Sequence, residues 1–309
     1  DSLADIAAYV AERATTIPFK FVDGNTASDV GKKVPDGGPW VILTDIERDI
    51  KAKMEEVGTP LKQLDVRIYR GVLTGLNDAF IIDKAKRDEL IAADPKSAEI
   101  IHPVLRGRDI KRYHYEFADQ YMIATHNGYK YDDTVFPRVD VEKYPAVKEW
   151  LSSFEPKLSE RADQGDTPYN LRKCAYMGDF SQPKIVWGNL CLRAQYAMVK
   201  DDAIVCAPSP FIATDDWFLL GVLNSKAADW YVHQVGVTRS GGYMEYKPVF
   251  VEQIPIPQNV PEKERTRIAS LAQAIQSGQR EEVPEYEEQI NDIVCDLYGI
   301  NNREIRILQ

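Results

Sequence analysis

The chain has 309 residues and a formal net charge of −10 at pH 7, from 38 basic and 48 acidic side chains. Hydrophobic residues make up 44% and charged residues 28%, values close to globular averages, which exclude a disordered chain, a collagen and a coiled-coil rod. No apolar stretch approaches the roughly 18–20 residues that a membrane-spanning helix needs. We therefore expect a cytoplasmic protein of one large or two ordinary domains, with no membrane among its partners.

Near the start of the chain, the apolar spacing of residues 3–10 predicts a short amphipathic helix. Residues 23–39 are rich in Gly, Asp, Ser, Lys and Pro, which is typical of a surface connection. Thr44 and Glu47 then form a capping box, because each side chain can satisfy a free backbone amide of the other. A second helix is predicted from there to about Gly58.

The segment 65–260 alternates β-branched and aromatic runs with helical spacings, which predicts mixed α and β structure. Strands are predicted at 66–69, 79–82, 121–124, 184–187 and 211–213. Helices are predicted at 86–93, 145–160 and 216–232.

The segment 261–309 is almost purely helical in its spacing, with a break between Gly278 and Pro284 and a glycine cap at Gly299. It predicts two antiparallel helices. The expected fold class is therefore α+β, with a mixed-sheet domain followed by a C-terminal antiparallel helical pair.

Four cysteines lie far apart, with no Cys-x-x-Cys pair and no nearby pair of histidines. This spacing disfavours structural zinc and a disulfide scaffold, and it favours buried free thiols in a reducing compartment. The four are Cys174, Cys191, Cys206 and Cys295. The sequence starts at Asp1, without a methionine or the apolar core of a secretory signal, and we interpret it as a trimmed part of a longer protein.

Several catalytic and cofactor motifs are missing from the sequence. It has no P-loop, no Gly-x-Gly-x-x-Gly after a strand, and no Asn/Asp-Pro-Pro-Tyr/Phe loop of an adenine methyltransferase; the similar letters at 167–170 stand in the wrong order and predict a turn. The four histidines have no partner at a metal-binding spacing. We therefore predict no catalytic residue, no metal and no cofactor in this chain.

One exception is the tripeptide Glu245-Tyr246-Lys247, which has the Glu-x-Lys spacing of metal-dependent nucleases. In that chemistry the carboxylate binds magnesium and the lysine polarises the phosphate. Asp229 is a candidate for the companion carboxylate. The alternative is that Glu245 and Lys247 simply alternate on a strand face, so a nuclease is the third hypothesis.

The densest basic feature is the segment 106–114, where four cations outweigh Asp109 for a local charge of +3 in an acidic chain. Such cations neutralise DNA phosphates, and an arginine can also address guanine O6 and N7. The alternative is a solvated turn whose arginines form ion pairs. The four cations are Arg106, Arg108, Lys111 and Arg112.

Other candidate DNA contacts stand beside aromatic residues or glycines. They are Arg172, Lys173, Arg193, Arg239 and Tyr243, with Asn77 as either an adenine contact or the cap of a turn. Glycines expected to shape the loops are Gly71, Gly75, Gly107, Gly241 and Gly242.

Six stretches, taken in chain order, resemble a known family. The two longest are Ile-Tyr-Arg-Gly-Val-Leu-Thr-Gly-Leu-Asn-Asp-Ala-Phe-Ile-Ile-Asp at 68–83 and Pro-Val-Leu-Arg-Gly-Arg-Asp-Ile-Lys-Arg-Tyr at 103–113. The others lie at 182–186, 220–226, 241–243 and 251–257. Together they are similar to the TaqI-like C-terminal specificity domain, the target recognition domain of Type IIG restriction-modification enzymes and related phage-defence adenine-specific DNA methyltransferases. The resemblance covers about 65–309 and departs from the family pattern at 125–180.

The resemblance implies that an N-terminal methyltransferase domain, often with a nuclease domain, performs the chemistry while this module recognises double-stranded DNA. Residues 1–64 would be a connector or the tail of that missing catalytic region, 65–260 the recognition domain, and 261–309 the helical pair. S-adenosylmethionine is expected in the missing domain. Arg239, Tyr243 and Lys247 would form a second contact loop, and docking would present an adenine for flipping.

A rival hypothesis from another class is a protein-interaction or subunit-docking domain with little DNA affinity of its own. Its motivation is the charge of −10 and the apolar stripe from Tyr286 to Leu297. The alternative interpretation is that the stripe only packs on the core of this chain.

Overall fold

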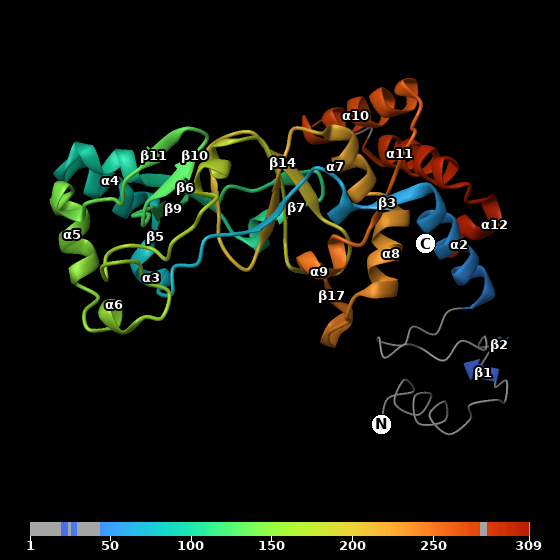
Figure 1. Cartoon of the computed structure of the whole chain (residues 1–309), viewed down its shortest axis with the longest axis horizontal. Helices are drawn as coiled ribbons and strands as arrows, with labels where there is room; N and C mark the ends of the chain where they lie inside the picture. Colours follow the sequence, from blue (N-terminus) through green and yellow to red (C-terminus); the bar gives the residue numbers. More distant parts are fainter. Residues whose placement is uncertain (1–19, 24–25, 30–43, 279–282, 309) are drawn as a thin grey trace.

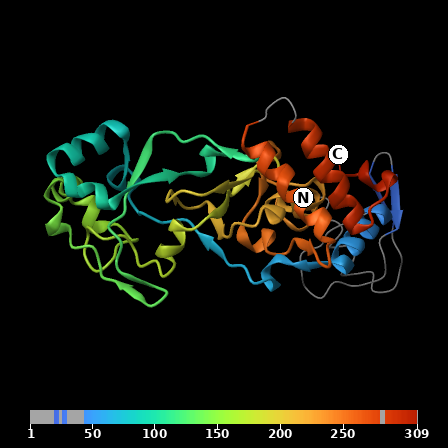
Figure 2. The same ribbon diagram turned by 90° about the horizontal axis from the view of Figure 1, so that it is seen from above.

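The computed structural model describes residues 20–23, 26–29, 44–278 and 283–308. The helix predicted at 3–10 lies outside these residues, as does most of the connection predicted at 23–39. At the start of that connection, β1 (Lys20–Asp23), which lies just before it, pairs with β2 (Thr26–Asp29) as an antiparallel hairpin. The described residues from 44 onward form an elongated molecule, with small helices at one end, strands in the middle and longer helices at the other end (Figure 1). Figure 2 shows the same order from above. The fold is α+β, as predicted.

Four antiparallel strands form the central sheet in the order β14-β12-β16-β4. They are β4 (Ile68–Arg70), β12 (Lys184–Trp187), β14 (Tyr196–Val199) and β16 (Pro210–Ala213). Side chains alternate along a strand, so Ile185 and Trp187 belong to one hydrophobic core and Val186 to another. The central sheet therefore separates two cores.

The core that contains Val186 lies under a second sheet, of order β15-β6-β9-β5. In this sheet β15 pairs parallel to β6, and the other pairs are antiparallel. Its strands are β5 (Ile81–Asp83), β6 (Ile101–Leu105), β9 (Gln120–Ile123) and β15 (Ile204–Val205). The helices at this end are α3 (Asn77–Phe80), α4 (Lys84–Ala93), α5 (Pro145–Ser152) and α6 (Lys157–Glu160).

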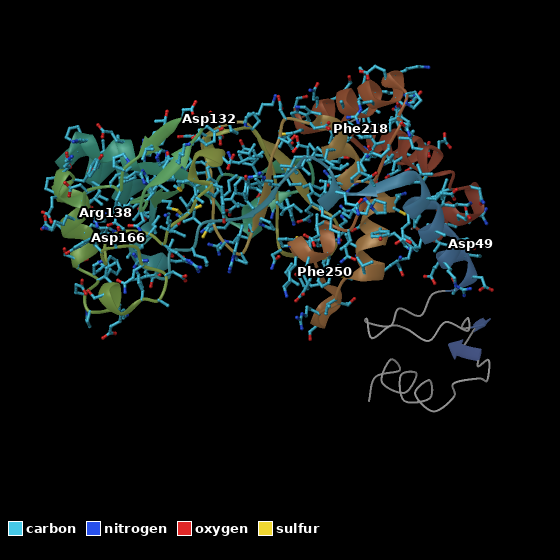
Figure 3. The ribbon with its side chains drawn as sticks, in the orientation of Figure 1. Asp49, Asp132, Arg138, Asp166, Phe218 and Phe250 are labelled. Carbon is cyan, nitrogen blue, oxygen red and sulfur yellow. The ribbon has the colours of Figure 1, made fainter. Side chains whose placement is uncertain are left out.

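The same end carries the hairpin β10 (Tyr129–Tyr131) and β11 (Thr134–Phe136), which the sequence patterns did not predict. Arg138 and Asp166 lie beside each other there (Figure 3) and form an ion pair of 3.8 Å. This pair joins the segment after β11 to the segment after α6.

The core that contains Ile185 and Trp187 lies among the helices at the opposite end (Figure 1). They are α2 (Asp45–Val57), α7 (Trp217–Leu223), α8 (Lys226–Val235), α9 (Pro248–Val251), α10 (Glu262–Gln276), α11 (Val283–Tyr298) and α12 (Asn302–Ile305). The capping box predicted before α2 is confirmed: the Glu47 amide donates to the Thr44 hydroxyl at 3.3 Å, and the Thr44 amide donates to the Glu47 carboxylate at 2.8 Å. Strands β3 (Gly58–Pro60) and β18 (Pro255–Pro257) pair beside α2.

The apolar stripe of α11 packs inside this core. Ile290, Val294 and Tyr298 are almost completely buried there, and α11 contacts α10, α8, α7 and α2. The feature that motivated the interaction-domain hypothesis is therefore used to hold the C-terminal helices on the rest of the chain.

Three predicted elements differ from the structure. The single helix predicted at 216–232 is two helices, because the Asn224 side chain bonds the backbone of Tyr196 at 3.0 and 2.9 Å and Ser225 starts α8 as its cap. The helix predicted at 145–160 is likewise divided into α5 and α6. In the strand predicted at 79–82, the first two residues end α3 instead.

Two further short antiparallel pairs complete the middle of the molecule. They are β7 (Ile110–Lys111) with β8 (His114–Tyr115), and β13 (Leu190–Cys191) with β17 (Met244–Glu245). The four cysteines are free, and burial raises the pKa of Cys191 and Cys206 to about 11. Among the described residues, no helix is both long and apolar enough to cross a membrane.

Candidate nucleic-acid interface

A basic groove of about 1070 Å³ lies in the middle of the molecule, where three main segments distant in sequence meet, with Pro208 and Ser209 as a fourth contribution to its lining. One is the turn after β6, one contains β13, and one is the loop before β17. The groove is lined by Arg106, Gly107, Arg108, Ile110, Lys111, Gly188, Asn189, Leu190, Cys191, Leu192, Gln195, Pro208, Ser209, Arg239, Ser240, Tyr243 and Glu245. Four cations and one carboxylate line it, so its local charge is opposite to that of the whole chain.

Arg106 shapes the turn on one side of the groove. Its Nε and one terminal nitrogen donate to the two carboxylate oxygens of Asp109 at 2.9 and 3.0 Å, and its backbone amide donates to the same carboxylate at 2.8 Å. Asp109 is buried. A charge neutralised in this way offers little to a phosphate, so the geometry assigns Arg106 to holding the turn.

Arg108 and Lys111 carry the available positive charge of this turn. The Arg108 side chain is exposed and makes no hydrogen bond or ion pair with the part of the chain that the structure describes. The Lys111 ammonium donates to the backbone oxygen of Arg108 at 2.7 Å, which keeps it at the groove without neutralising it.

Arg112 points away from the groove. Its Nε donates to the Glu287 carboxylate of α11 at 2.6 Å, its terminal nitrogen donates to the Ala194 oxygen at 3.4 Å, and its side chain is only 14% exposed. Arg112 therefore joins the β7–β8 turn to α11.

The opposite wall is the loop 239–245. Gly241 and Gly242 both have a φ of 78°, in the left-handed region that glycine adopts at little cost, and they carry Tyr243 with 42% of its surface exposed. Arg239 and Lys247 both pair with the buried Glu245 carboxylate, at 2.6 and 2.7 Å. Hydrogen bonds from Lys247 and then Arg239 lower the pKa of Glu245.

This arrangement gives the nuclease hypothesis no support. The Glu245 carboxylate is neutralised by its two cations, and the Asp229 carboxylate accepts hydrogen bonds from the Tyr246 hydroxyl and from the Ala194 amide at 2.8 Å. Within residues 44–278 and 283–308, no three His, Cys, Asp or Glu side chains are grouped as a metal site.

Two glycines keep the floor of the groove open. A Cβ added to Gly107 would lie 2.9 Å from the Ser209 hydroxyl, and one added to Gly188 would lie 2.9 Å from the Cys191 sulfur. A side chain at Gly107 would have to displace the Ser209 hydroxyl, and one at Gly188 would have to displace the Cys191 sulfur.

The remaining predicted residues lie elsewhere. Arg172 and Lys173 share a smaller pocket of about 350 Å³ with Gly71, and Arg193 is exposed beside a third hollow that Lys111 and Gln195 also line. The Asn77 carboxamide oxygen accepts a hydrogen bond from the Thr74 hydroxyl at 2.5 Å, so it closes the turn that contains Gly75.

Sequence patterns missed three polar residues of the groove, Asn189, Gln195 and Ser209. Uncharged polar side chains in loops are common in any chain, so nothing in the sequence singles them out. The first of them directly precedes β13, which pairs with β17, and residues of both strands line the groove.

Comparisons with known proteins identify the family of this chain and its similarity in fold to solved structures. The family model of the TaqI-like C-terminal specificity domain matches residues 102–256, which is half of the chain. A solved structure of the Type IIL restriction-modification enzyme MmeI in complex with DNA is similar in fold, with a TM-score of 0.59 and 14% identity over 80% of this chain and 35% of that chain. The type IIG restriction endonuclease BpuSI matches with a TM-score of 0.48 and 13% identity, over 83% of this chain and 34% of that chain.

This chain thus spans about a third of the length of those two structures. A comparison with curated proteins finds no match.

Proposed function

Because the chain belongs to the TaqI-like C-terminal specificity domain family, we propose that it recognises the target sequence on double-stranded DNA for a restriction-modification enzyme. The observation that carries the proposal is the basic groove, which Arg108 and Lys111 line together with Arg239 and Tyr243. Phosphates are neutralised by such cations, while polar side chains between them can reach base edges.

The parent enzyme would be an adenine-specific DNA methyltransferase of phage defence, acting in the cytoplasm and possessing, in some arrangements, an endonuclease domain as well. Its methyltransferase domain would lie N-terminal to this chain and bind S-adenosylmethionine, and the module would dock against it. Support for this division comes from the motifs missing here and from the fraction of the longer structures that this chain matches.

The test is binding of a randomised duplex pool by this chain at two salt concentrations, measured by fluorescence anisotropy, with the bound fraction sequenced. We expect an enriched sequence and an affinity that falls with salt, because each phosphate contact releases counterions. Charge reversal by Arg108→Glu with Lys111→Glu should abolish binding. Reversal of two exposed lysines outside the groove, Lys62→Glu with Lys263→Glu, is the matched control.

Binding without any enriched sequence would contradict recognition by this chain. Binding that the groove reversal and the control reversal weaken equally would contradict the groove as the site.

A further inference from the structure

We propose that Asn189 and Gln195 are the adenine-reading side chains of the basic groove. The proposal rests on the DNA-recognition function above and specifies which residues determine its sequence preference. Both amides line the same groove as the cations of the basic turn and the loop 239–245. They are therefore placed where a base edge would lie once the phosphates contact Arg108 and Lys111.

The backbone that carries the two amides is held firmly. The Asn189 carbonyl accepts from the Tyr246 amide at 3.0 Å, and the next two residues form β13 against β17. On the other side, the amide of Ala194 donates to the Asp229 carboxylate at 2.8 Å, and Tyr196 begins β14. A rigid backbone is what a reading site needs, because discrimination depends on fixed hydrogen-bond geometry.

Three polar side chains that line the groove have atoms without a hydrogen-bond partner among the described residues. The Asn189 Oδ1 is withdrawn from solvent and has no partner within the described chain, and the same holds for the hydroxyl of Ser209, which is 1% exposed and lines the groove. The Gln195 amide makes no hydrogen bond to any described residue either. Buried polar groups in proteins are nearly always paired, so the Asn189 oxygen would gain a partner when its carboxamide turns into the groove, whereas the half-buried Gln195 amide is already open to a base edge there.

The chemistry of a carboxamide selects the base. It presents one donor and one acceptor side by side, which matches the N7 acceptor and N6 donor of adenine in the major groove. Guanine offers two acceptors there and is suited to arginine, whereas cytosine offers a donor and is suited to a carboxylate. The neighbouring Arg108 and Lys111 supply charge but no acceptor, so the two amides are the groups that can distinguish adenine.

The experiment uses the enriched duplex from the randomised pool and measures binding of the wild-type chain and its variants. We expect an enriched A·T pair whose replacement by G·C weakens wild-type binding by about 5- to 150-fold, the range for one bidentate contact. Gln195→Ala and Asn189→Ala should each remove discrimination at one such position. Gln195→Glu should move the preference at its position from adenine to cytosine. The control is Gln63→Ala, an exposed amide outside the groove.

A second measurement changes the DNA and compares the effect of that change within each protein. Replacing each enriched adenine with 7-deazaadenine removes N7 alone, and it should weaken binding of the wild-type chain but not weaken Gln195→Ala further at the adenine that Gln195 reads. The assignment would be overturned if 7-deazaadenine reduced binding equally in the wild type and in both amide variants. It would also be overturned if both variants kept the wild-type preference for A·T over G·C. Either result would leave DNA recognition intact. Failure of the wild-type chain to bind DNA would instead overturn the proposed function and this inference with it.

Discussion

Three arginines stand within seven residues of the basic turn, and their partners give them different roles. Arg106 pairs with buried Asp109, Arg112 pairs with Glu287, and Arg108 has no partner among the described residues. A phosphate competes poorly with a carboxylate that is already bonded, so Arg108 is the arginine of this turn with charge to offer DNA.

Arg108→Ala should therefore weaken DNA binding by a similar factor for every sequence. It should also reduce the slope of log affinity against log salt by about 0.9, the contribution of one phosphate contact. A salt titration by fluorescence anisotropy measures both quantities. Lys263→Ala, which removes an exposed cation outside the groove, should leave the slope unchanged, and an unchanged slope in Arg108→Ala would remove Arg108 from the phosphate contacts.

Lys184 shows how burial changes the acid–base behaviour of a single residue. Its ammonium is completely buried and donates to the backbone oxygens of Phe180 and Asp201 at 2.8 and 2.7 Å. Burial lowers the pKa of Lys184 from 10.5 to about 8. Between those values the unfolded chain binds more protons than the folded chain, so this residue's contribution to the unfolding free energy rises with pH.

We predict that the unfolding free energy of the wild type, minus that of Lys184→Met, increases between about pH 8 and about pH 9.5, by at most about 1.4 kcal/mol per pH unit. Denaturant titrations of both proteins measure it. The subtraction cancels the buried thiols and tyrosines, whose raised pKa values act in the opposite direction at high pH. A difference that stays constant with pH would contradict a lowered pKa.

Sequence patterns predict the residue types of the groove but not their partners. The cluster at 106–114 is visible as a local charge of +3, yet the division among its arginines depends on Asp109 and on Glu287, which lies far along the chain. The role of Asn77 was left open between a base contact and a turn cap, and its bond to Thr74 is that of a cap.

At the scale of elements, the packing of α7 on α10 depends on one glycine. A Cβ added to Gly221 would lie 2.4 Å from the Ile268 Cγ2, inside the core at the helical end. By helix propensity alone, alanine at this position would stabilise the fold by roughly 1 kcal/mol relative to glycine. The contact with Ile268 acts in the opposite direction, because alanine would overfill the core there.

Gly221→Ala should lower the unfolding free energy by about 1–3 kcal/mol, the usual cost of overfilling a core. Thermal or denaturant unfolding measures the loss. In an Ile268→Ala background the obstructing methyl group is gone, so the same glycine substitution should there be neutral or stabilising. Equal losses in both backgrounds would show that the contact between the helices is not the cause.

The Arg112–Glu287 pair joins the β7–β8 turn to α11, and both side chains are mostly buried. Arg112→Ala should lower the unfolding free energy by about 1–3 kcal/mol, because it leaves Glu287 without its cation in a partly desolvated place. The salt slope of DNA binding should not change. A double-mutant cycle with Glu287→Gln measures the coupling, and a coupling near zero together with a reduced salt slope would return Arg112 to the DNA contacts.

Most elements could be predicted from spacing, and the exceptions share a cause. The long helical patterns at 145–160 and 216–232 contain internal breaks, at the second of which Asn224 bonds β14, a contact with no signature in local periodicity. The α11 stripe was correctly predicted as apolar and helical, whereas its burial depends on where α2, α7 and α8 lie.

At the scale of the whole molecule, an acidic chain builds a basic groove by bringing together segments around 106, 190 and 240. The central sheet supports this arrangement because β12 ends and β14 begins at the segment that carries β13, and Gly107 and Gly188 lie close to each other. The family resemblance was readable from ordered motifs, and the family model confirms it. Which motifs meet in space depends on strand pairing, and for that reason Asn189 and Gln195 had no sequence signal.

The central claim is that duplex DNA lies in the basic groove, and photo-crosslinking tests it most directly. A benzophenone side chain in place of Tyr243, which is exposed in the groove, should crosslink to the enriched duplex under ultraviolet light, and excess unlabelled duplex should compete. The same group in place of Ile307, exposed near the end of the described chain and outside the groove, should not crosslink. Crosslinking at Ile307 but not at Tyr243, in variants that still bind the duplex, would contradict the account.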